Sequence, residues 1–288
     1  MGYDGAGGIE ILRRAILTLV LFVVPLGGAQ AALQDIDFGR YHALVIGINE
    51  YQNLTKLQTA VNDASAVGDL LRQKYGFEVT MLLNPGRSAI IRALDGLRAK
   101  LTERDNLLVY YAGHGVLDDE ADEGFWLSVD AEDGTQADWI SIATITSTVR
   151  AMTAKHVMVV SDSCYSGRIT REAPASLQSG SEREDELRRL AAKRSRTALV
   201  SGGLEPVSDG GGEGHSVFTR AFLTALRESN EVMDGQQLFT AVRRPVIVNA
   251  RQTPEYSDIH LAGHDGGDFL FVPIALSAAG AEDYAAEE

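Results

Sequence analysis

The feature that most constrains the fold is a regular alternation of short apolar runs with segments of helical periodicity. Strands are expected at 41–48, 77–83, 106–112, 156–161, 197–201 and 269–272, and helices at 62–75, 88–101, 141–152, 218–227 and 235–249. Strands that alternate with helices form a mostly parallel sheet with helices on both faces. The sequence therefore predicts an α/β fold. Residues 125–129 are expected to be half of a small hairpin, and Pro245 is expected to disturb the last helix.

Charge and cysteine content exclude several classes of function. The 288 residues contain 26 Lys and Arg against 40 Asp and Glu, which gives a formal net charge of −14. Such a chain lacks the general electrostatic attraction for nucleic acid, so no nucleic-acid partner is expected. One cysteine forms neither an intrachain disulfide nor a thiolate zinc site. The sequence carries no signal for an oligomeric state.

The N-terminus has the pattern of an export signal. Two arginines precede an apolar run from Ala15 to Leu26, which is shorter than the roughly 20 residues that cross a bilayer. The small residues Ala29 and Ala31 follow with the spacing of a cleavage site. Residues 1–31 are therefore predicted to be a signal peptide, and the protein is predicted to be periplasmic or secreted. An uncleaved membrane anchor within 13–31 and a buried N-terminal helix are the alternatives.

Two chemically capable side chains follow neighbouring predicted strands. His114 lies between two glycines after the strand at 106–112, and Cys164, the single cysteine, follows the strand at 156–161 among small polar residues. If these strands pair, both side chains emerge from the same edge of the sheet, because neighbouring strands lie about 4.8 Å apart. A thiol beside an imidazole suits nucleophilic catalysis. The backbone N–H groups of Gly115 and Cys164 are candidate oxyanion donors.

These residues resemble a known family, the caspase-like cysteine peptidases, and most of all the metacaspases and their bacterial relatives. The histidine and cysteine blocks lie 50 positions apart, which is close to the spacing of about 50 in caspases. The resemblance covers about residues 40–273 and rests on Asn62-Asp63-Ala64, Gly113-His114-Gly115, Asp162-Ser163-Cys164-Tyr165-Ser166-Gly167 and His215-Ser216-Val217-Phe218-Thr219. It implies a three-layer α/β/α sandwich with about six strands, and a cysteine endopeptidase activity.

The resemblance also implies how the chain is divided. A larger portion at 40–167 and a smaller portion at 197–273 would form one catalytic domain, joined by an exposed linker at 168–196. Residues 274–288 form an acidic, alanine-rich tail. The linker is rich in basic residues, and family members often cleave themselves in this region. Self-cleavage there is therefore a hypothesis.

Two acids point to the substrate class that the resemblance implies. Metacaspases cut proteins after Arg or Lys, and Asp63 and Asp162 match the acids of their P1 pocket. A pair of carboxylates suits a guanidinium, which it binds through charge-assisted hydrogen bonds. Each acid also has a structural interpretation. Asp63 would be a helix N-cap near Asn62, and Asp162 would accept hydrogen bonds from loop amides.

The chain departs from the family pattern at several positions. Ala112 replaces a frequent serine and Ala60 a frequent cysteine, and the caspase signature Q-A-C-[RQG]-G is absent. The dyad requires no cofactor. Many metacaspases need calcium, so Ca²⁺ remains a candidate, although a solvated loop is the preferred interpretation of the acids Asp118, Asp119, Glu120, Asp122, Glu123 and Asp130. The main alternative function is a catalytically silent caspase-like binding or scaffold module, and a second alternative keeps the dyad but changes the P1 preference.

Overall fold

The computed structural model describes residues 36–163, 181–202 and 214–276. Their centre is a six-stranded sheet with the order β10-β8-β7-β3-β1-β2, in which all pairs are parallel except β10 with β8. The strands are β1 (Arg40–Gly47), β2 (Glu78–Leu83), β3 (Asp105–Ala112), β7 (His156–Asp162), β8 (Ser195–Val200) and β10 (Glu255–Asp258). The predicted α/β class with a mostly parallel sheet of about six strands is confirmed.

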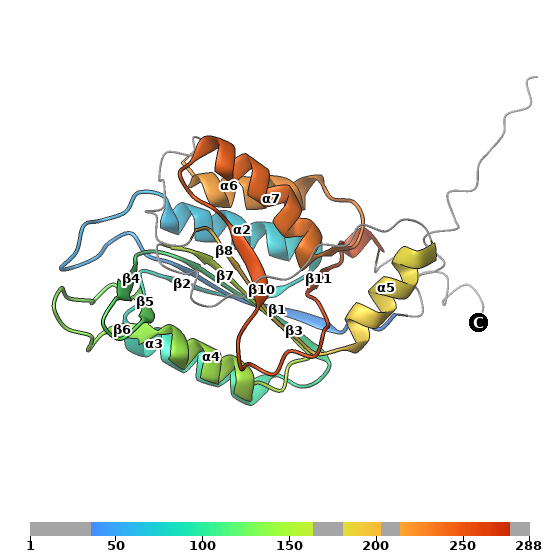
Figure 1. Cartoon of the computed structure of the whole chain (residues 1–288), viewed down its shortest axis with the longest axis horizontal. Coiled ribbons are helices and arrows are strands. Elements are labelled where there is room, and N and C mark those ends of the chain that lie inside the picture. Colours follow the sequence, from blue (N-terminus) through green and yellow to red (C-terminus); the bar gives the residue numbers. More distant parts are fainter. Residues whose placement is uncertain (1–35, 164–180, 203–213, 277–288) are drawn as a thin grey trace, which may run out of the picture.

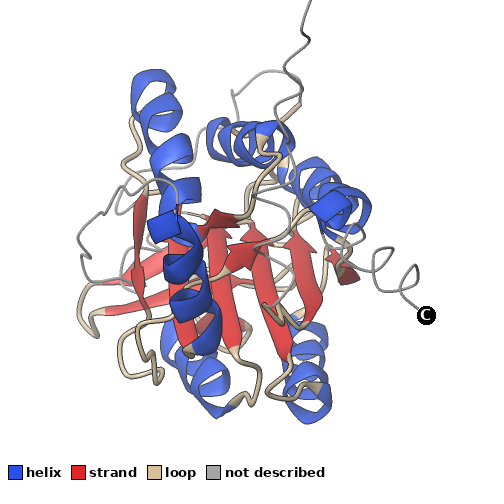
Figure 2. Cartoon of the chain, turned by 90° about the vertical axis from the view of Figure 1, so that its right-hand side faces the viewer, coloured by secondary structure: helices blue, strands red, loops and turns tan. Residues whose placement is uncertain are grey.

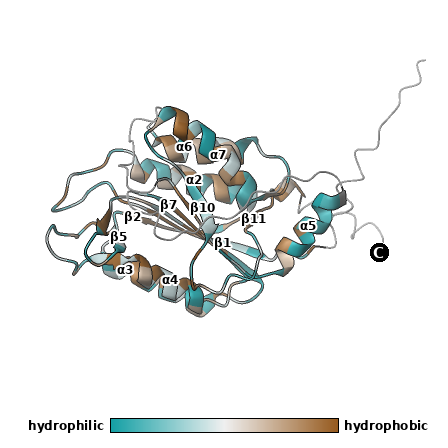
Figure 3. Ribbon diagram, in the orientation of Figure 1, coloured by the Kyte–Doolittle hydropathy of each residue, from teal (hydrophilic) through white to brown (hydrophobic). Residues whose placement is uncertain are grey.

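Helices cover both faces of this sheet, as Figures 1 and 2 show. One face carries α2 (Ala60–Tyr75), α6 (Val217–Glu228) and α7 (Gly235–Asn249), and the other carries α3 (Arg87–Lys100) and α4 (Ile142–Ala151). The remaining helix, α5 (Ser181–Ala192), lies beyond one end of the sheet and is largely hydrophilic in Figure 3. The result is the predicted three-layer α/β/α sandwich.

The central strand β3 explains why the sheet needs two helical layers. All eight of its residues are buried, and their side chains alternate between the two faces. Leu108 and Tyr110 join the apolar core under α2 and α6, whereas Leu107, Val109 and Tyr111 join the core under α3 and α4. A strand that is apolar on both faces is typical of a parallel sheet.

Smaller elements at the rim differ in part from the expectations. The expected hairpin is confirmed: β4 (Gly115–Asp118) pairs with β5 (Glu123–Leu127), and β6 (Trp139–Ser141) adds a third strand. The predicted last strand is reduced to β11 (Leu270–Phe271), which pairs with β9 (Met233–Asp234) outside the main sheet. The main sheet instead ends in β10, which the sequence analysis did not predict.

Two further expectations concern helices. Pro245 lies inside α7, which runs uninterrupted from Gly235 to Asn249, so the expected disturbance does not end the helix. The predicted signal sequence at 1–31 lies outside the described residues. Among the residues that are described, no helix is long and apolar enough to cross a membrane.

The exposed connection predicted at 168–196 ends earlier than expected. The part of it that the structure describes contains α5, which buries Leu187 and Ala191, and the start of β8. Arg196, the last residue of the predicted exposed linker, is fully buried. Its guanidinium and Nε–H donate to the carbonyls of Val149, Met152, Ala154, Lys155 and Ser195 at 2.7–3.1 Å. Five carbonyl acceptors replace water around the charge, and burial lowers the pKa of Arg196 to about 9.

We expect Arg196→Lys to lower the free energy of unfolding by about 2 kcal/mol or more, because an ammonium cannot reproduce the planar fork and leaves buried carbonyls without a donor. Urea denaturation measures this change. The control is Arg92→Lys on the exposed face of α3, for which no comparable loss is expected. Equal midpoints for the two variants would contradict the structural role of Arg196.

Candidate active site

The parallel pairing of β3 with β7 creates the edge at which the predicted site lies. Ala112 and Asp162 are register partners at the ends of the two strands. The ladder continues one step further, because the N–H of Gly113 donates to the carbonyl of Asp162 at 3.3 Å. His114 therefore follows β3 at the same edge where β7 ends. Cys164 lies outside the described residues, two positions after Asp162 in the sequence.

His114 is held in place by contacts to its backbone and to its ring. Its N–H donates to the Tyr51 hydroxyl at 2.7 Å, and its carbonyl accepts from the Tyr111 hydroxyl at 2.6 Å. On the ring, Nε2 lies 2.7 Å from the carbonyl of Thr55. A carbonyl only accepts, so this contact requires the proton on Nε2 in the neutral imidazole. The second ring nitrogen, Nδ1, is then the one that can accept a proton from a thiol.

The glycines on both sides of His114 have different roles. A Cβ on Gly113 would lie 2.7 Å from the hydroxyl oxygens of both Tyr51 and Tyr111, so no larger residue fits between them. Gly115 opens β4 opposite Trp126, and the bond from the N–H of Leu127 to the carbonyl of His114 makes this a non-hydrogen-bonded pair. The N–H of Gly115 therefore points away from β5, in a direction where it can serve another acceptor.

The two predicted pocket acids are brought together by one short segment. Asp63 lies in the first turn of α2, whose N-cap is Thr59, so the alternative role of Asp63 as an N-cap is wrong. Its carboxylate accepts from His215 Nδ1 at 2.7 Å and from the N–H of Ser216 at 3.3–3.4 Å. Asp162 accepts from the Ser216 hydroxyl and from the Thr219 hydroxyl, the latter at 2.8 Å. Ser216 thus bridges the two acids.

Both carboxylates lie deep in the protein. Asp63 and Asp162 are 1% and 2% exposed, so their charges need the hydroxyl, amide and imidazole donors around them. Tyr110 on β3 lies beneath them and forms a 2.5 Å hydrogen bond with Thr219. Burial, followed by the negative charges of Asp162 and Asp63, raises the pKa of Tyr110 well above its ordinary value. Tyr110 therefore stays protonated and neutral beside the acids.

Sequence reasoning missed the residues that serve these acids. His215, Ser216 and Thr219 belong to the block that resembles the family, but the sequence assigns them no role at the site. The one local signal is Ser216 at the N-cap of α6, where its hydroxyl accepts from the N–H of Thr219. Its contacts with Asp63 and Asp162 join positions 153 and 54 residues apart, which a pattern of neighbouring residues does not reveal.

Two of the acids considered as calcium ligands, Asp118 and Glu123, make contacts within the protein. Asp118 accepts from the backbone N–H groups of Glu120 and Ala121 and from Gln136, and Glu123 accepts from the N–H of Ala143 at the start of α4. Within the described ranges, no three His, Cys, Asp or Glu residues are grouped so that they could hold a metal ion. Calcium binding by this chain stays a prediction.

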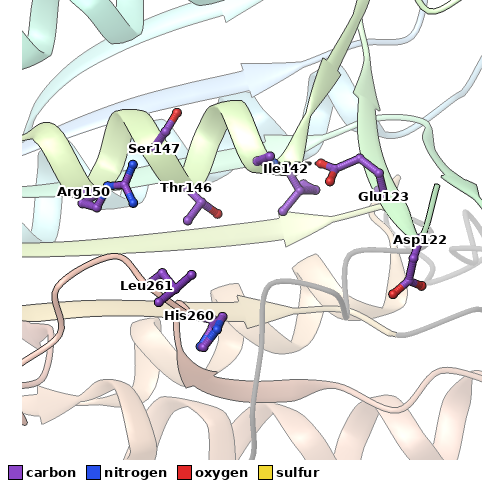
Figure 4. Close-up of a pocket in the computed structure, with 10 residues that line it drawn as sticks. Asp122, Glu123, Ile142, Thr146, Ser147, Arg150, His260 and Leu261 are labelled. Atoms are coloured by element: carbon purple, nitrogen blue, oxygen red, sulfur yellow. Dashed lines mark hydrogen bonds between the residues drawn. The ribbon is translucent and has the colours of Figure 1, made fainter.

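A separate surface hollow lies beside these acids. Its volume is about 500 Å³, and Figure 4 shows Asp122 and Glu123 near one end and Arg150 near the other. Side chains of α4 face His260 and Leu261 across it. None of the residues that line the hollow belongs to the predicted dyad or to the pocket acids.

We expect Ser216→Ala to lower the free energy of unfolding by about 2 kcal/mol, because it removes both a helix cap and a donor to the buried Asp162. The matched control is Ser141→Ala, which removes the N-cap of α4 but no carboxylate contact, with an expected loss of about 1 kcal/mol. Chemical denaturation of both variants measures the difference. Equal losses would contradict the role of Ser216 as a bridge between the acids.

Comparisons with known proteins agree with this architecture. Residues 40–263 match the caspase-domain family. A metacaspase-1A of Neurospora crassa is 28% identical over 213 residues, which cover 68% of this chain and 46% of that protein. A metacaspase-1 of Meyerozyma guilliermondii is 30% identical over 102 residues, which cover 30% of this chain and 25% of that protein. The chain thus spans less than half the length of these two relatives.

A solved structure supports the fold independently. The crystal structure of a protein from Geobacter sulfurreducens aligns with a TM-score of 0.54 and 20% identity, covering 75% of this chain and 92% of that one. At this identity the likeness concerns the fold alone. The family match covers most of the chain and includes the histidine edge, both acids and the single cysteine. The chain belongs to the caspase-domain family of cysteine peptidases.

Proposed function

We propose that this protein is a cysteine endopeptidase that cleaves its protein substrates after Arg or Lys, with Cys164 as nucleophile and His114 as its acid–base partner. The observation that carries the proposal is the in-register pairing of β3 with β7, which brings the residues before His114 and before Cys164 into backbone contact. Cys164 follows Asp162 by two positions in the sequence, and two residues of extended chain span about 7 Å at most.

The proposed reaction uses the tautomer that the Thr55 carbonyl favours. His114 Nδ1 takes the proton of the Cys164 thiol, and the thiolate attacks the scissile carbonyl carbon. The N–H groups of Gly115 and Cys164 stabilise the oxyanion, and the imidazolium gives its proton to the leaving amine. A water then hydrolyses the thioester, with His114 as the base, and the thiol returns.

The proposed P1 pocket is built on Asp63 and Asp162. Their carboxylates meet at Ser216, and two negative charges in so little space match one guanidinium or ammonium. Because Asp63 already accepts from His215, a substrate cation has to share this carboxylate or displace the imidazole. The Ser216 hydroxyl and the Thr219 hydroxyl keep Asp162 in place in either case.

The location and the cofactor needs of the enzyme are proposed on sequence grounds. The pattern at residues 1–31 supports export to the periplasm or the medium. We propose that no cofactor takes part in the dyad chemistry. The test of activity below compares assays with calcium and assays with a chelator.

We expect the purified chain to hydrolyse fluorogenic peptides with Arg or Lys at P1 and to leave matched Asp and Ala peptides intact. Turnover should disappear in Cys164→Ala, since this is the only thiol in the chain. Each assay is run with calcium and with a chelator, and equal rates are expected. A folded wild-type protein without turnover of any peptide would favour the silent binding module instead.

We expect Asp63→Asn to lower kcat/KM for an Arg peptide by about 10- to 100-fold, which is the worth of one charge-assisted hydrogen bond. The control is Asp69→Asn, a change on the exposed face of the same helix. Circular dichroism and thermal melting verify that both variants fold. If kcat/KM for the Arg peptide stayed the same in Asp63→Asn, the pocket assignment would be wrong.

A further inference from the structure

We infer that the stacked pair of Tyr111 and Trp126, assisted by Tyr51, is a positioning unit that fixes the histidine turn relative to the strand that leads to the nucleophile. The inference rests on the Cys164–His114 dyad of the proposed function, but not on its P1 preference. The rings of Tyr111 and Trp126 are 4.4 Å apart and only 5° from parallel. Both side chains are at most 1% exposed.

Tyr111 of the pair holds the backbone of His114 through its hydroxyl group. The Tyr111 hydroxyl contacts the His114 carbonyl at 2.6 Å and also accepts from the N–H of Leu127 at 3.2 Å. Because the N–H of Leu127 donates to the same His114 carbonyl at 3.0 Å, the turn, the hydroxyl and β5 form one closed network. The turn cannot shift without breaking contacts to both partners.

The tryptophan side of the pair reaches the opposite half of the dyad. The Trp126 indole N–H donates to the Ser161 hydroxyl at 3.1 Å, and this hydroxyl lies 2.9 Å from the hydroxyl of Ser163. Ser163 is the residue directly before Cys164 and is 1% exposed. One rigid aromatic pair thus contacts the histidine backbone on one side and, on the other, the Ser161 hydroxyl, which links it to the residue that precedes the nucleophile.

Tyr51 fixes the other side of the turn. Its hydroxyl accepts from the N–H of His114 at 2.7 Å, and its ring lies against the imidazole with centroids 4.6 Å apart. Tyr51 and Tyr111 therefore hold the two backbone groups of one residue. A histidine whose backbone and ring are both held in this way suits the role of a catalytic base, because a displacement of about 1 Å can lower the rate about a hundredfold.

The test uses alkylation by iodoacetamide, because the chain has a single thiol and the reaction requires no substrate recognition. The rate of alkylation rises with pH as the thiolate forms, and an imidazolium partner moves this rise below the range of a free thiol, about pH 8.5. The profile is recorded for wild type, His114→Ala, Tyr111→Phe and Trp126→Phe. The control is Tyr75→Phe, which removes a buried hydroxyl–carbonyl bond of 2.8 Å between α2 and α6.

In Tyr111→Phe and Trp126→Phe we expect the alkylation profile to move toward that of His114→Ala, while Tyr75→Phe keeps the wild-type profile. With a cleavable peptide, kcat should fall by about tenfold or more at an unchanged KM, because geometry and not binding is lost. Thermal melting of all the tyrosine variants measures their loss of stability. Because Tyr75→Phe should be destabilised to a similar extent, it shows whether lower stability alone moves the alkylation profile.

The outcomes separate the two proposals. If His114→Ala leaves the profile unchanged, the dyad of the proposed function is wrong. If His114→Ala shifts it but Tyr111→Phe and Trp126→Phe behave as Tyr75→Phe does, the dyad stands and the positioning unit is overturned. A shift in both aromatic variants supports the positioning unit even when no peptide is cleaved.

Discussion

The backbone pairing of β3 with β7 is the interaction on which the rest of the structure depends. Both strands are buried along their whole length, so their registers are set by apolar side chains on two faces and by the ladder between them. A slip by one residue would turn every side chain of a strand to the opposite layer. The same constraint that builds the core therefore determines which residues leave it at the polar edge.

Polar groups inside this apolar frame are paired across long stretches of sequence. Asp63 and Asp162 take their donors from the start of α6 and the residues just before it, and Arg196 takes most of its acceptors from the end of α4 and the connection between α4 and β7. A buried charge without such partners would cost several kcal/mol. Consequently these residues specify how the helices sit on the sheet as strictly as the apolar contacts do.

The strands and helices that the sequence predicted correctly are those with a strong local pattern. Runs such as 106–112 and 156–161 are mostly apolar, and the rule that sequential strands are usually neighbours favoured their pairing. β10 has the sequence Glu-Tyr-Ser-Asp, which carries no strand pattern, and it forms because the edge of β8 is available. Arg196 was misjudged because charged residues are rarely buried, and its carbonyl acceptors come from distant positions.

The candidate site was predictable to a similar extent. The histidine, the cysteine and both acids follow from motifs, because each motif is local. Their environment does not, since Tyr51, Trp126 and His215 act through contacts that only the folded chain creates. The chemical type of each site residue can thus be predicted from the sequence, whereas the groups that hold its side chain in place depend on tertiary structure.

The buried Arg196 has a consequence for the covalent continuity of the molecule. It belongs to β8, which follows β7 in the sequence, yet most of its donors reach carbonyls that precede β7. His156 adds a contact of its ring to the carbonyl of Lys193, and β8 lies along β7 through six register pairs. A single peptide-bond break between Ser163 and Ser181 would therefore yield a two-chain particle that keeps one common core, instead of two separate fragments.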